Sequence, residues 1–472
     1  MDPIQQNLLR KLPGVDHVLE LWDKTQPVED GVPRAVLVRS IRTTLDRLRT
    51  RILAGDELLD EALFSDSQLL HLTEEAVKKA MGFKLKRVIN ATGVVVHTNL
   101  GRSLLPKRVA ERVAEISSQY SNLEFDLEKG ARGSRYSCVE DILCELSGAE
   151  VAIVVNNNAG AVFLSLETLA KGKEVIVSRG ELVEIGGSFR IPDVMARSGA
   201  KLVEVGTTNR THLSDYERAI RDETALLLKV HTSNYSMVGF TAEVSLQDLV
   251  ALGAKYHLPV MKDLGSGNFV DFSKYDLMKE PTVQETIAAG ADVVTFSGDK
   301  MLGGPQAGII VGKKDVLARI KQNPINRALR IDKMTLAALE ATLHLYRDET
   351  QAISSIPTLR MLTLPPTLIS KKARRLQNRL KKLGSDRLKT VLIKGSSRVG
   401  GGALPLQELP TKCVGVRIEG LSANHIERIM REATPPIIGR IENDLFVMDV
   451  RTVQDEELAI IASTFKKIVA EA

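Results

Sequence analysis

Residues 292–308, with the sequence DVVTFSGDKMLGGPQAG, decide the fold of this 472-residue chain. The apolar run at the start predicts a buried strand, and Lys300 follows shortly after it ends. Because burial penalises the charge of a lysine, a lysine at this position is expected to have a functional role. A Schiff base with the aldehyde of pyridoxal phosphate (PLP) would be such a role, and it removes most of the charge. Ser297 is placed to reach the phosphate of the cofactor. Taken alone, the motif also fits a surface lysine in a glycine-rich loop.

A second apolar run ends in an acid. The segment VMKDLGSG (residues 260–267) places Asp263 where its carboxylate can pair with the pyridinium nitrogen of PLP. That pairing keeps the ring protonated and able to accept electrons. An aspartate here also fits a turn or a helix cap. The order of Asp263 before Lys300, each at the end of a strand in one α/β region, favours the cofactor role.

A third apolar run ends in a turn that suits phosphate. The segment NNNAGAVF (156–163) follows the run VAIVV and opens a helix. Because N–H groups at a helix N-terminus bind phosphate, Asn158, Ala159 and Gly160 are expected to cradle the PLP phosphate. The order of phosphate turn, aspartate and lysine, each after a strand, resembles that of fold-type-I PLP enzymes. The resemblance implies the fold of aspartate aminotransferase.

Secondary-structure patterns divide the chain into three predicted regions. Residues 1–82 show helical periodicity and are expected to form a helical N-terminal module, with one helix starting from a cap at Thr73. Residues 83–350 alternate short apolar strands with helices, which predicts a large α/β domain with a mostly parallel sheet. Residues 351–472 begin with proline-containing loops and are expected to form a small α+β domain.

The composition is that of an ordinary globular protein, with 43% hydrophobic and 26% charged residues. The formal net charge of +5 is too weak to indicate nucleic acid binding by itself. Three cysteines are too few for a disulfide framework and favour reduced thiols in a cytoplasmic protein. Neither a signal peptide nor a membrane span is expected. The eight histidines are scattered and predict no metal site.

Further blocks make the resemblance more specific. Together with SGDKMLGGPQAG, they identify the chain as similar to bacterial selenocysteine synthases, the L-seryl-tRNA(Sec) selenium transferases, over nearly its whole length. This resemblance implies PLP-dependent conversion of seryl-tRNA(Sec) to selenocysteinyl-tRNA(Sec), with selenophosphate as donor and a dehydroalanyl-tRNA intermediate. It also implies a homodecamer built from dimers. The blocks are RVINATGVVVHTNLGRSLLP (87–106), YSNLEFDLEKGARGSRYSCVE (120–140), GTTNRTHLSDYE (206–217) and TPPIIGRIENDLFVMDVRT (434–452).

Three arginines are candidates for binding the selenium donor. Arg327 and Arg330 stand three apart in NPINRALRIDK (323–333) and share a face if that segment is helical. Planar guanidinium groups suit phosphate-like anions. The resemblance places both residues, with Arg102, at the selenophosphate pocket beside Asp299. Taken singly, each arginine also fits a solvated surface residue or a structural ion pair.

Two basic segments are candidates for RNA contact. The first, residues 34–51, has six arginines with Asp46 as its one acid, and an apolar stripe predicts that it is a helix with a core-facing side. A basic helix face suits an RNA backbone. The second, KKARRLQNRLKK (371–382), is a basic amphipathic helix. Both also fit ordinary solvated helix faces. The arginines are Arg34, Arg39, Arg42, Arg47, Arg49 and Arg51, and the stripe is Val38, Ile41, Leu45, Leu48 and Ile52.

The residues leave two other functions open. A small-molecule PLP lyase of the ammonia-lyase type shares the same core and needs no tRNA module, although a helical oligomerisation arm would resemble residues 1–82. A non-catalytic tRNA-binding scaffold needs neither Lys300 nor Asp263. The helical module disfavours the lyase, and the presence of both residues disfavours the scaffold.

Overall fold

A computed structural model describes residues 3–25, 31–55, 64–185 and 189–471. The chain divides into two compact units, Met1–Arg87 and Val88–Ala472. Within the described ranges, no helix combines the length and the apolar character that crossing a membrane requires. The three cysteines, all of them described, are free thiols.

The described part of the first unit is helical. Its helix α3 buries the predicted stripe from Ile41 to Ile52, and Leu45 and Leu48 pack with side chains of α2 and α4 in a small core. The prediction that a helix begins at Thr73 is wrong. Thr73 lies inside a longer helix that begins at Asp66, and its side chain is buried. The helices are α1 (Pro3–Lys11), α2 (Val15–Thr25), α3 (Arg34–Leu53) and α4 (Asp66–Met81).

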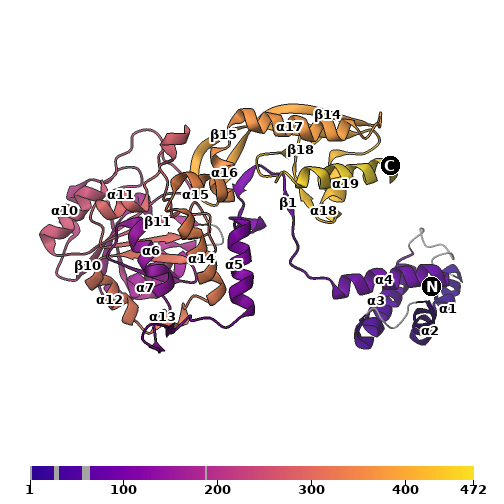
Figure 1. Cartoon of the computed structure of the whole chain (residues 1–472), viewed down its shortest axis with the longest axis horizontal. Helices are drawn as coiled ribbons and strands as arrows, with labels where there is room; N and C mark the ends of the chain where they lie inside the picture. The colour runs from indigo at the N-terminus through magenta and orange to yellow at the C-terminus, as the bar shows by residue number, and fades with distance from the viewer. Residues whose placement is uncertain (1–2, 26–30, 56–63, 186–188, 472) are drawn as a thin grey trace. The chain divides into compact units, whose positions relative to one another are not determined.

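A seven-stranded sheet forms the centre of the second unit (Figure 1). All neighbouring strands are parallel except β13, which is antiparallel to both of its neighbours. The prediction of a mostly parallel sheet is therefore confirmed. The strand order is β5 (Val151–Val155), β13 (Gly308–Gly312), β12 (Val293–Ser297), β11 (Val260–Gly265), β10 (Thr224–Val230), β6 (Glu174–Ser178) and β9 (Lys201–Val205).

Helices cover both faces of this sheet, which is why its strands are mostly apolar. Successive side chains of a strand point to opposite faces. In β6, Val175 and Val177 therefore join the core that contains α7 (Asn158–Ala170) and α8 (Ile191–Ser198), whereas Ile176 packs with α9 and α10. The other helices here are α5 (Lys107–Ser118), α6 (Ser137–Ser147), α9 (Leu213–Ala219), α10 (Leu246–Tyr256), α11 (Val283–Ala288), α12 (Lys314–Gln322), α13 (Ile325–Ala328), α14 (Lys333–Leu345), α15 (Glu349–Ser355) and α16 (Pro357–Thr363).

Short elements complete this region. Two-residue strands pair as β3 (Phe125–Asp126) with β4 (Ala131–Arg132), and as β7 (Glu184–Ile185) with β8 (Phe189–Arg190). Short 3-10 helices are η3 (Thr98–Leu100), η4 (Arg179–Glu181) and η5 (Phe272–Tyr275).

A five-stranded sheet forms the C-terminal part of the second unit. Its order is β17 (Arg440–Glu442), β18 (Leu445–Asp449), β15 (Ala403–Ile418), β14 (Leu388–Gly400) and β2 (Val94–Val96). Helices α17 (Pro366–Lys381), α18 (Ala423–Glu432) and α19 (Glu457–Glu471) share its core. Strand β1 (Ile89–Asn90) pairs with β16 (Ile437–Ile438). Residues 89–96, assigned from the sequence to the large domain, thus pair with C-terminal strands.

Candidate active site

The three strands singled out by the sequence end at one edge of the large sheet. Strands β5 and β12 both run antiparallel to β13 and so point the same way, and β11 is parallel to β12. That edge therefore carries the start of α7, the acid of β11 and the loop after β12. Ligands of open α/β sheets bind at the carboxyl ends of the strands.

Asp263 is held rigidly at this edge. It is 3% exposed, and its Oδ1 accepts hydrogen bonds from Asn158 Nδ2 at 2.9 Å, Gly265 N at 3.1 Å and Thr295 Oγ1 at 3.1 Å. All three donors converge on one oxygen of the carboxylate. A carboxylate fixed in this way can present its second oxygen to a further cationic N–H, such as a protonated ring nitrogen.

Lys300 is buried close to Asp263. It is 6% exposed and lies three residues past the end of β12. Burial lowers the pKa of its amine; the carboxylate of Asp263 opposes this shift and the charge of Arg102 adds to it. A lowered pKa leaves more neutral amine at a given pH. The neutral amine is the form that attacks an aldehyde or accepts a proton.

An arginine from the 87–106 block contacts the residue before this lysine. Arg102 Nη1 donates to Asp299 Oδ2 at 2.8 Å, across 197 positions of sequence. Ser103 Oγ lies 2.8 Å from the carbonyl oxygens of both Asp299 and Lys300. Arg102 has a left-handed backbone, with φ at 62°, and bridges His97. This turn directs the loop toward the segment that carries Lys300.

The start of α7 was predicted to bind phosphate, and the structure shows that one of its N–H groups has another partner. Asn157 caps the helix, and its Oδ1 accepts from Gly160 N at 2.8 Å. That N–H is therefore already used, whereas the sequence suggested that it binds phosphate. The role of the backbone N–H groups of Asn158 and Ala159 stays a prediction. Ser297 also stays a prediction; it is 6% exposed at the end of β12.

The other two candidate arginines line a different cavity. Arg327 and Arg330 face a space of about 400 Å³, and Arg330 Nη1 lies 3.5 Å from Glu124 Oε1. Arg330 follows the end of α13 and its backbone bridges Val155, so the two arginines do not share a helical face. Arg102 lines a cavity of about 50 Å³. Within one chain the three arginines are thus divided between two cavities.

Comparison with known proteins shows the family to which this chain belongs. The sequence model described as "L-seryl-tRNA selenium transferase" matches residues 88–454, and the model described as "Selenocysteine synthase N terminal" matches residues 9–49. The chain belongs to the L-seryl-tRNA selenium transferase family. The L-seryl-tRNA(Sec) selenium transferase of Geotalea daltonii is 54% identical over 463 residues, which cover 98% of this chain and 100% of that relative. That of Solidesulfovibrio magneticus is 56% identical over 460 residues, 97% of each chain.

The fold of this selenium transferase family member has a relative among solved structures. D-Glucosaminate-6-phosphate ammonia-lyase matches with a TM-score of 0.56 and 23% identity, and the match covers 84% of this chain and 98% of that one. This likeness concerns the fold alone. With the strand order and the strand-end residues described above, it confirms the predicted α/β fold of fold-type-I PLP-dependent transferases.

Other polar residues at this edge of the transferase fold were not predicted from the sequence. Thr295 is polar within the apolar run of β12 and contacts Asp263. His231 directly follows β10, and its buried Nε2 has no hydrogen-bond partner and lies 3.6 Å from Oε1 of the buried Glu280. The rule that identified Lys300, a polar residue after an apolar strand, also selects His231. No sequence pattern marks Glu280.

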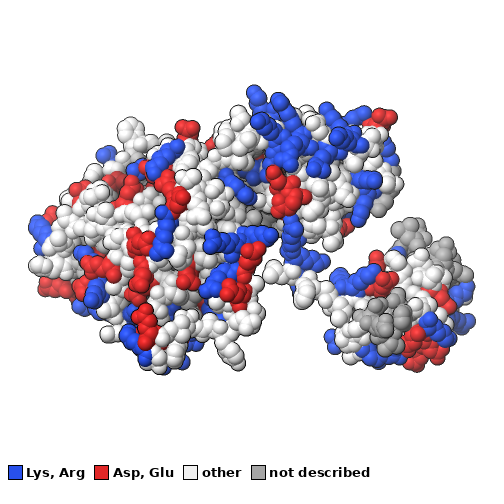
Figure 2. Space-filling model, viewed as in Figure 1, with Lys and Arg blue, Asp and Glu red and all other residues white. Residues whose placement is uncertain are grey.

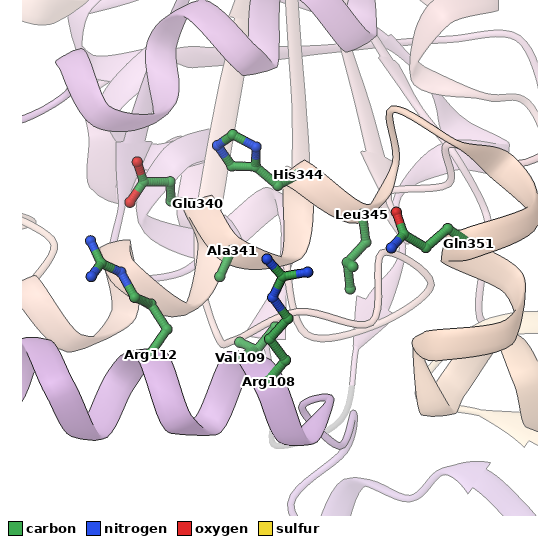
Figure 3. A pocket seen from close by; sticks show the side chains of 8 residues that line it. All are labelled: Arg108, Val109, Arg112, Glu340, Ala341, His344, Leu345 and Gln351. Carbon is green, nitrogen blue, oxygen red and sulfur yellow. The ribbon is translucent and has the colours of Figure 1, made fainter.

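A further cavity, of about 420 Å³, lies between α5 and α14 (Figure 3). Arg108 and Arg112 project into it from α5, and Glu340 and His344 line it from α14. It shares no lining residue with the predicted site of the transferase. The candidate active site is therefore the edge that carries Lys300.

Proposed function

We propose that this chain catalyses the PLP-dependent conversion of seryl-tRNA(Sec) to selenocysteinyl-tRNA(Sec), with selenophosphate as donor and a dehydroalanyl-tRNA intermediate. The observation that carries the proposal is the buried Lys300 beside the hydrogen-bonded Asp263, at the ends of neighbouring strands in a member of this family. Relatives more than 50% identical over nearly the whole chain are named L-seryl-tRNA(Sec) selenium transferases.

The residues at the site fit PLP. Lys300 would hold the aldehyde carbon, Asp263 the ring nitrogen, and Ser297 with the start of α7 the phosphate. Two buried atoms without a hydrogen-bond partner, Asn158 Oδ1 and His231 Nε2, belong to residues that contact Asp263. Buried polar atoms in native proteins are normally satisfied, so both support a bound polar group. When bound, PLP supplies an electron sink for negative charge at the Cα of serine.

The chain's own residues then move protons and hold anions. The neutral amine of Lys300 takes the proton from the Cα of serine, and its burial favours the neutral form. The Ser103 hydroxyl, which donates to the carbonyls of this segment, and the Arg102–Asp299 pair hold the segment around Lys300. The serine hydroxyl leaves with a proton as water, and the selenium of selenophosphate bonds to Cβ in its place while a proton returns to Cα. Water then cleaves the P–Se bond and releases phosphate. Arg102 and the arginines of the larger cavity are proposed to hold the anionic donor.

Incubation of the purified protein with PLP, seryl-tRNA(Sec) and labelled selenophosphate tests this function. We expect the label in the aminoacyl group of the tRNA and none without selenophosphate. The ammonia-lyase alternative instead predicts ammonia release from a phosphorylated amino-sugar acid and no labelled tRNA. The match of residues 9–49 to a selenocysteine synthase N-terminal family is an observation that the lyase does not explain.

Replacement of Asp263 by Asn should slow turnover about 10- to 150-fold, because a charge-assisted hydrogen bond contributes about 1.5–3 kcal/mol. The visible absorbance of bound PLP should remain, since Lys300 is unchanged. Single-turnover rates with seryl-tRNA measure the effect. Asp271→Asn is the control, because Asp271 caps η5 and contacts no predicted site residue. Equal single-turnover rates in both variants would show that Asp263 does not act on the cofactor.

Arg327→Ala and Arg330→Ala should each raise the selenophosphate concentration needed for half-maximal turnover about 10- to 150-fold, because charged hydrogen bonds to the donor are lost. The PLP absorbance should stay normal. Arg132→Ala is the matched control, because Arg132 lines the same cavity but is 80% exposed. Initial rates over a range of selenophosphate concentrations give the comparison. An unchanged dependence in both test variants would contradict the donor role.

We also propose that the chain assembles as the homodecamer implied by the resemblance, in the reducing cytoplasm. The division of the candidate arginines between two cavities of one chain supports an oligomer, because a second copy offers a way to bring both sets to one donor. The three free cysteines are compatible with a reducing compartment.

A further inference from the structure

A dense basic patch covers part of the C-terminal region. Residues 366–400 contain eleven Lys or Arg and one Asp, a net charge of +10, while the whole chain carries +5. The rest of the chain is therefore net acidic. Figure 2 shows basic side chains gathered over α17 and the neighbouring strand β14, with a few acidic side chains at one border.

The packing of α17 fixes which side of this helix faces the solvent. Ile369, Ala373, Leu376 and Leu380 are fully buried in the core that α17 shares with β14, β15 and α19. The helix contains no acidic residue. Its outer side is therefore basic, and the helix cannot rotate this side inward without exposing its apolar stripe. The exposed cations are Lys371, Arg374, Arg375, Arg379 and Lys381 on the helix, and Lys382 directly after its end.

Most of these cations have no anionic partner among the residues that the structure describes. Asp455 lies 3.1 Å from Arg375 Nη1 and 3.5 Å from Lys372 Nζ, which neutralises the middle of α17 in part. In the described ranges, Arg374, Arg379 and Lys382 form no ion pair with a carboxylate. Like charges that stand three or four residues apart on a helix repel each other. A bound polyanion would remove that repulsion.

We propose that the α17 face made by Arg374, Arg379 and Lys382 binds the phosphate backbone of the tRNA substrate. This inference rests on the proposed function, which supplies the tRNA. The helix has 16 residues and is thus about 24 Å long, enough to span several phosphates. Lysine and arginine bind such a backbone by releasing its condensed counterions.

The structure favours RNA over a lipid surface as the polyanion. A helix that binds a membrane surface inserts its apolar side among the lipids. The apolar side of α17 is already buried in the protein core, so it is not available for insertion. The outer side carries no aromatic residue. What remains is a row of charges, which suits a phosphate backbone.

The chemistry of this face also limits what it can recognise. Contacts to phosphates position a nucleic acid but carry no direct base information. The α17 face is therefore an affinity surface that treats tRNA(Sec) and other tRNAs alike, and discrimination belongs to another part of the chain. Its contribution should also fall steeply with salt, because counterion release is the driving force.

The test compares two triple variants of the full chain loaded with PLP. Arg374→Gln/Arg379→Gln/Lys382→Gln removes the face, and glutamine keeps the helix propensity. Arg218→Gln/Lys255→Gln/Lys274→Gln is the matched control, because it changes the net charge equally but removes cations paired with Asp215, Glu217 and Glu349. Mobility shifts with tRNA(Sec) and with a second tRNA, at several salt concentrations, measure the affinity.

We expect the α17 variant to bind both tRNAs about 10- to 100-fold more weakly at low salt, since exposed charge contacts are individually modest. The slope of log affinity against log salt should be smaller in magnitude by about two to three, because each lost phosphate contact removes about 0.7–0.9 from that slope. The control should match the wild type. Single variants Arg374→Gln and Lys382→Gln should each lower the slope by about one. The absorbance of bound PLP and the circular dichroism should be unchanged in all variants.

The outcomes separate this surface from the proposed function. If the α17 variants bind tRNA with unchanged affinity and slope while the wild type turns over seryl-tRNA, the surface is wrong and the function stands. If the wild type binds no tRNA, the function fails and the surface fails with it. A loss confined to tRNA(Sec) would overturn the backbone contact. Loss of binding to phosphatidylserine vesicles, with tRNA binding intact, would assign the face to lipid instead.

Discussion

Lys300→Ala should abolish the visible absorbance of bound PLP and lower turnover of seryl-tRNA by about 10⁴-fold or more, because both the covalent anchor and the proton acceptor are lost. Lys300 is buried beside Asp263, where its neutral form is favoured. Borohydride reduction of the loaded wild type, followed by peptide mass analysis, should place the pyridoxyl mass on the peptide that contains Lys300. The variant should carry no such label.

Lys262 provides the matched control for this experiment. It is 4% exposed, and burial, reinforced by the nearby charge of Lys229, lowers its pKa to about 8. It is therefore the second buried lysine with amine chemistry near Asp263. Neighbouring residues of a strand point to opposite faces, so Lys262 and Asp263 face opposite ways from β11. Lys262→Met should keep the absorbance and the label on Lys300. A pyridoxyl mass found on Lys262 would move the cofactor to the other face of the sheet.

The strand-end residues could be predicted from the sequence because their signal is local. A charged side chain directly after an apolar run is conspicuous, and parallel strands bring such ends to one edge. Lys300 and Asp263 were found in this way, and the fold follows from the same alternation of strands and helices. His231 carries the same signal after β10 and was overlooked.

The contacts that build the site around these residues have no local signal. The pair of Arg102 and Asp299 joins positions 197 apart, and the contact of Asn158 with Asp263 joins positions 105 apart. No local sequence pattern pairs the two residues of either contact. The phosphate-cradle role predicted for Asn158 concerns its backbone N–H and stays a prediction, and nothing in the sequence indicates that its side-chain amide also donates to the carboxylate of Asp263. That second contact depends on the chain's path across the sheet.

Removal of the N-terminal unit should abolish most of the affinity for tRNA(Sec) but leave the cofactor site intact. A chain that begins at Gly82 should keep the absorbance of bound PLP, because Lys300 and Asp263 lie in the second unit and the helices before Gly82 have a core of their own. It should bind tRNA(Sec) at least about 100-fold more weakly at physiological salt and give no detectable turnover on seryl-tRNA. Mobility shifts at two salt concentrations and the labelled-selenium assay measure both effects.

The basic helix α3 explains why this unit should hold RNA, and it supplies a finer test. Arg34 and Arg49 donate to Asp23 and Asp46, each at 2.7 Å, so both cations are already paired within the chain. Arg42 is exposed on the same helix and forms no described ion pair. Arg42→Gln should therefore weaken tRNA binding several-fold, while Arg34→Gln, whose cation is already paired, should change it less.

The residual binding of the truncated chain separates the two RNA surfaces. If α17 contributes affinity as proposed, the chain that begins at Gly82 should retain weak binding that disappears as salt rises and that does not distinguish tRNA(Sec) from other tRNAs. Selectivity should be present only when the first unit is present. If the truncated chain instead binds tRNA(Sec) as tightly and as selectively as the full chain, the first unit is not the RNA reader. Its helices would then belong to oligomer assembly, and recognition would lie within the second unit.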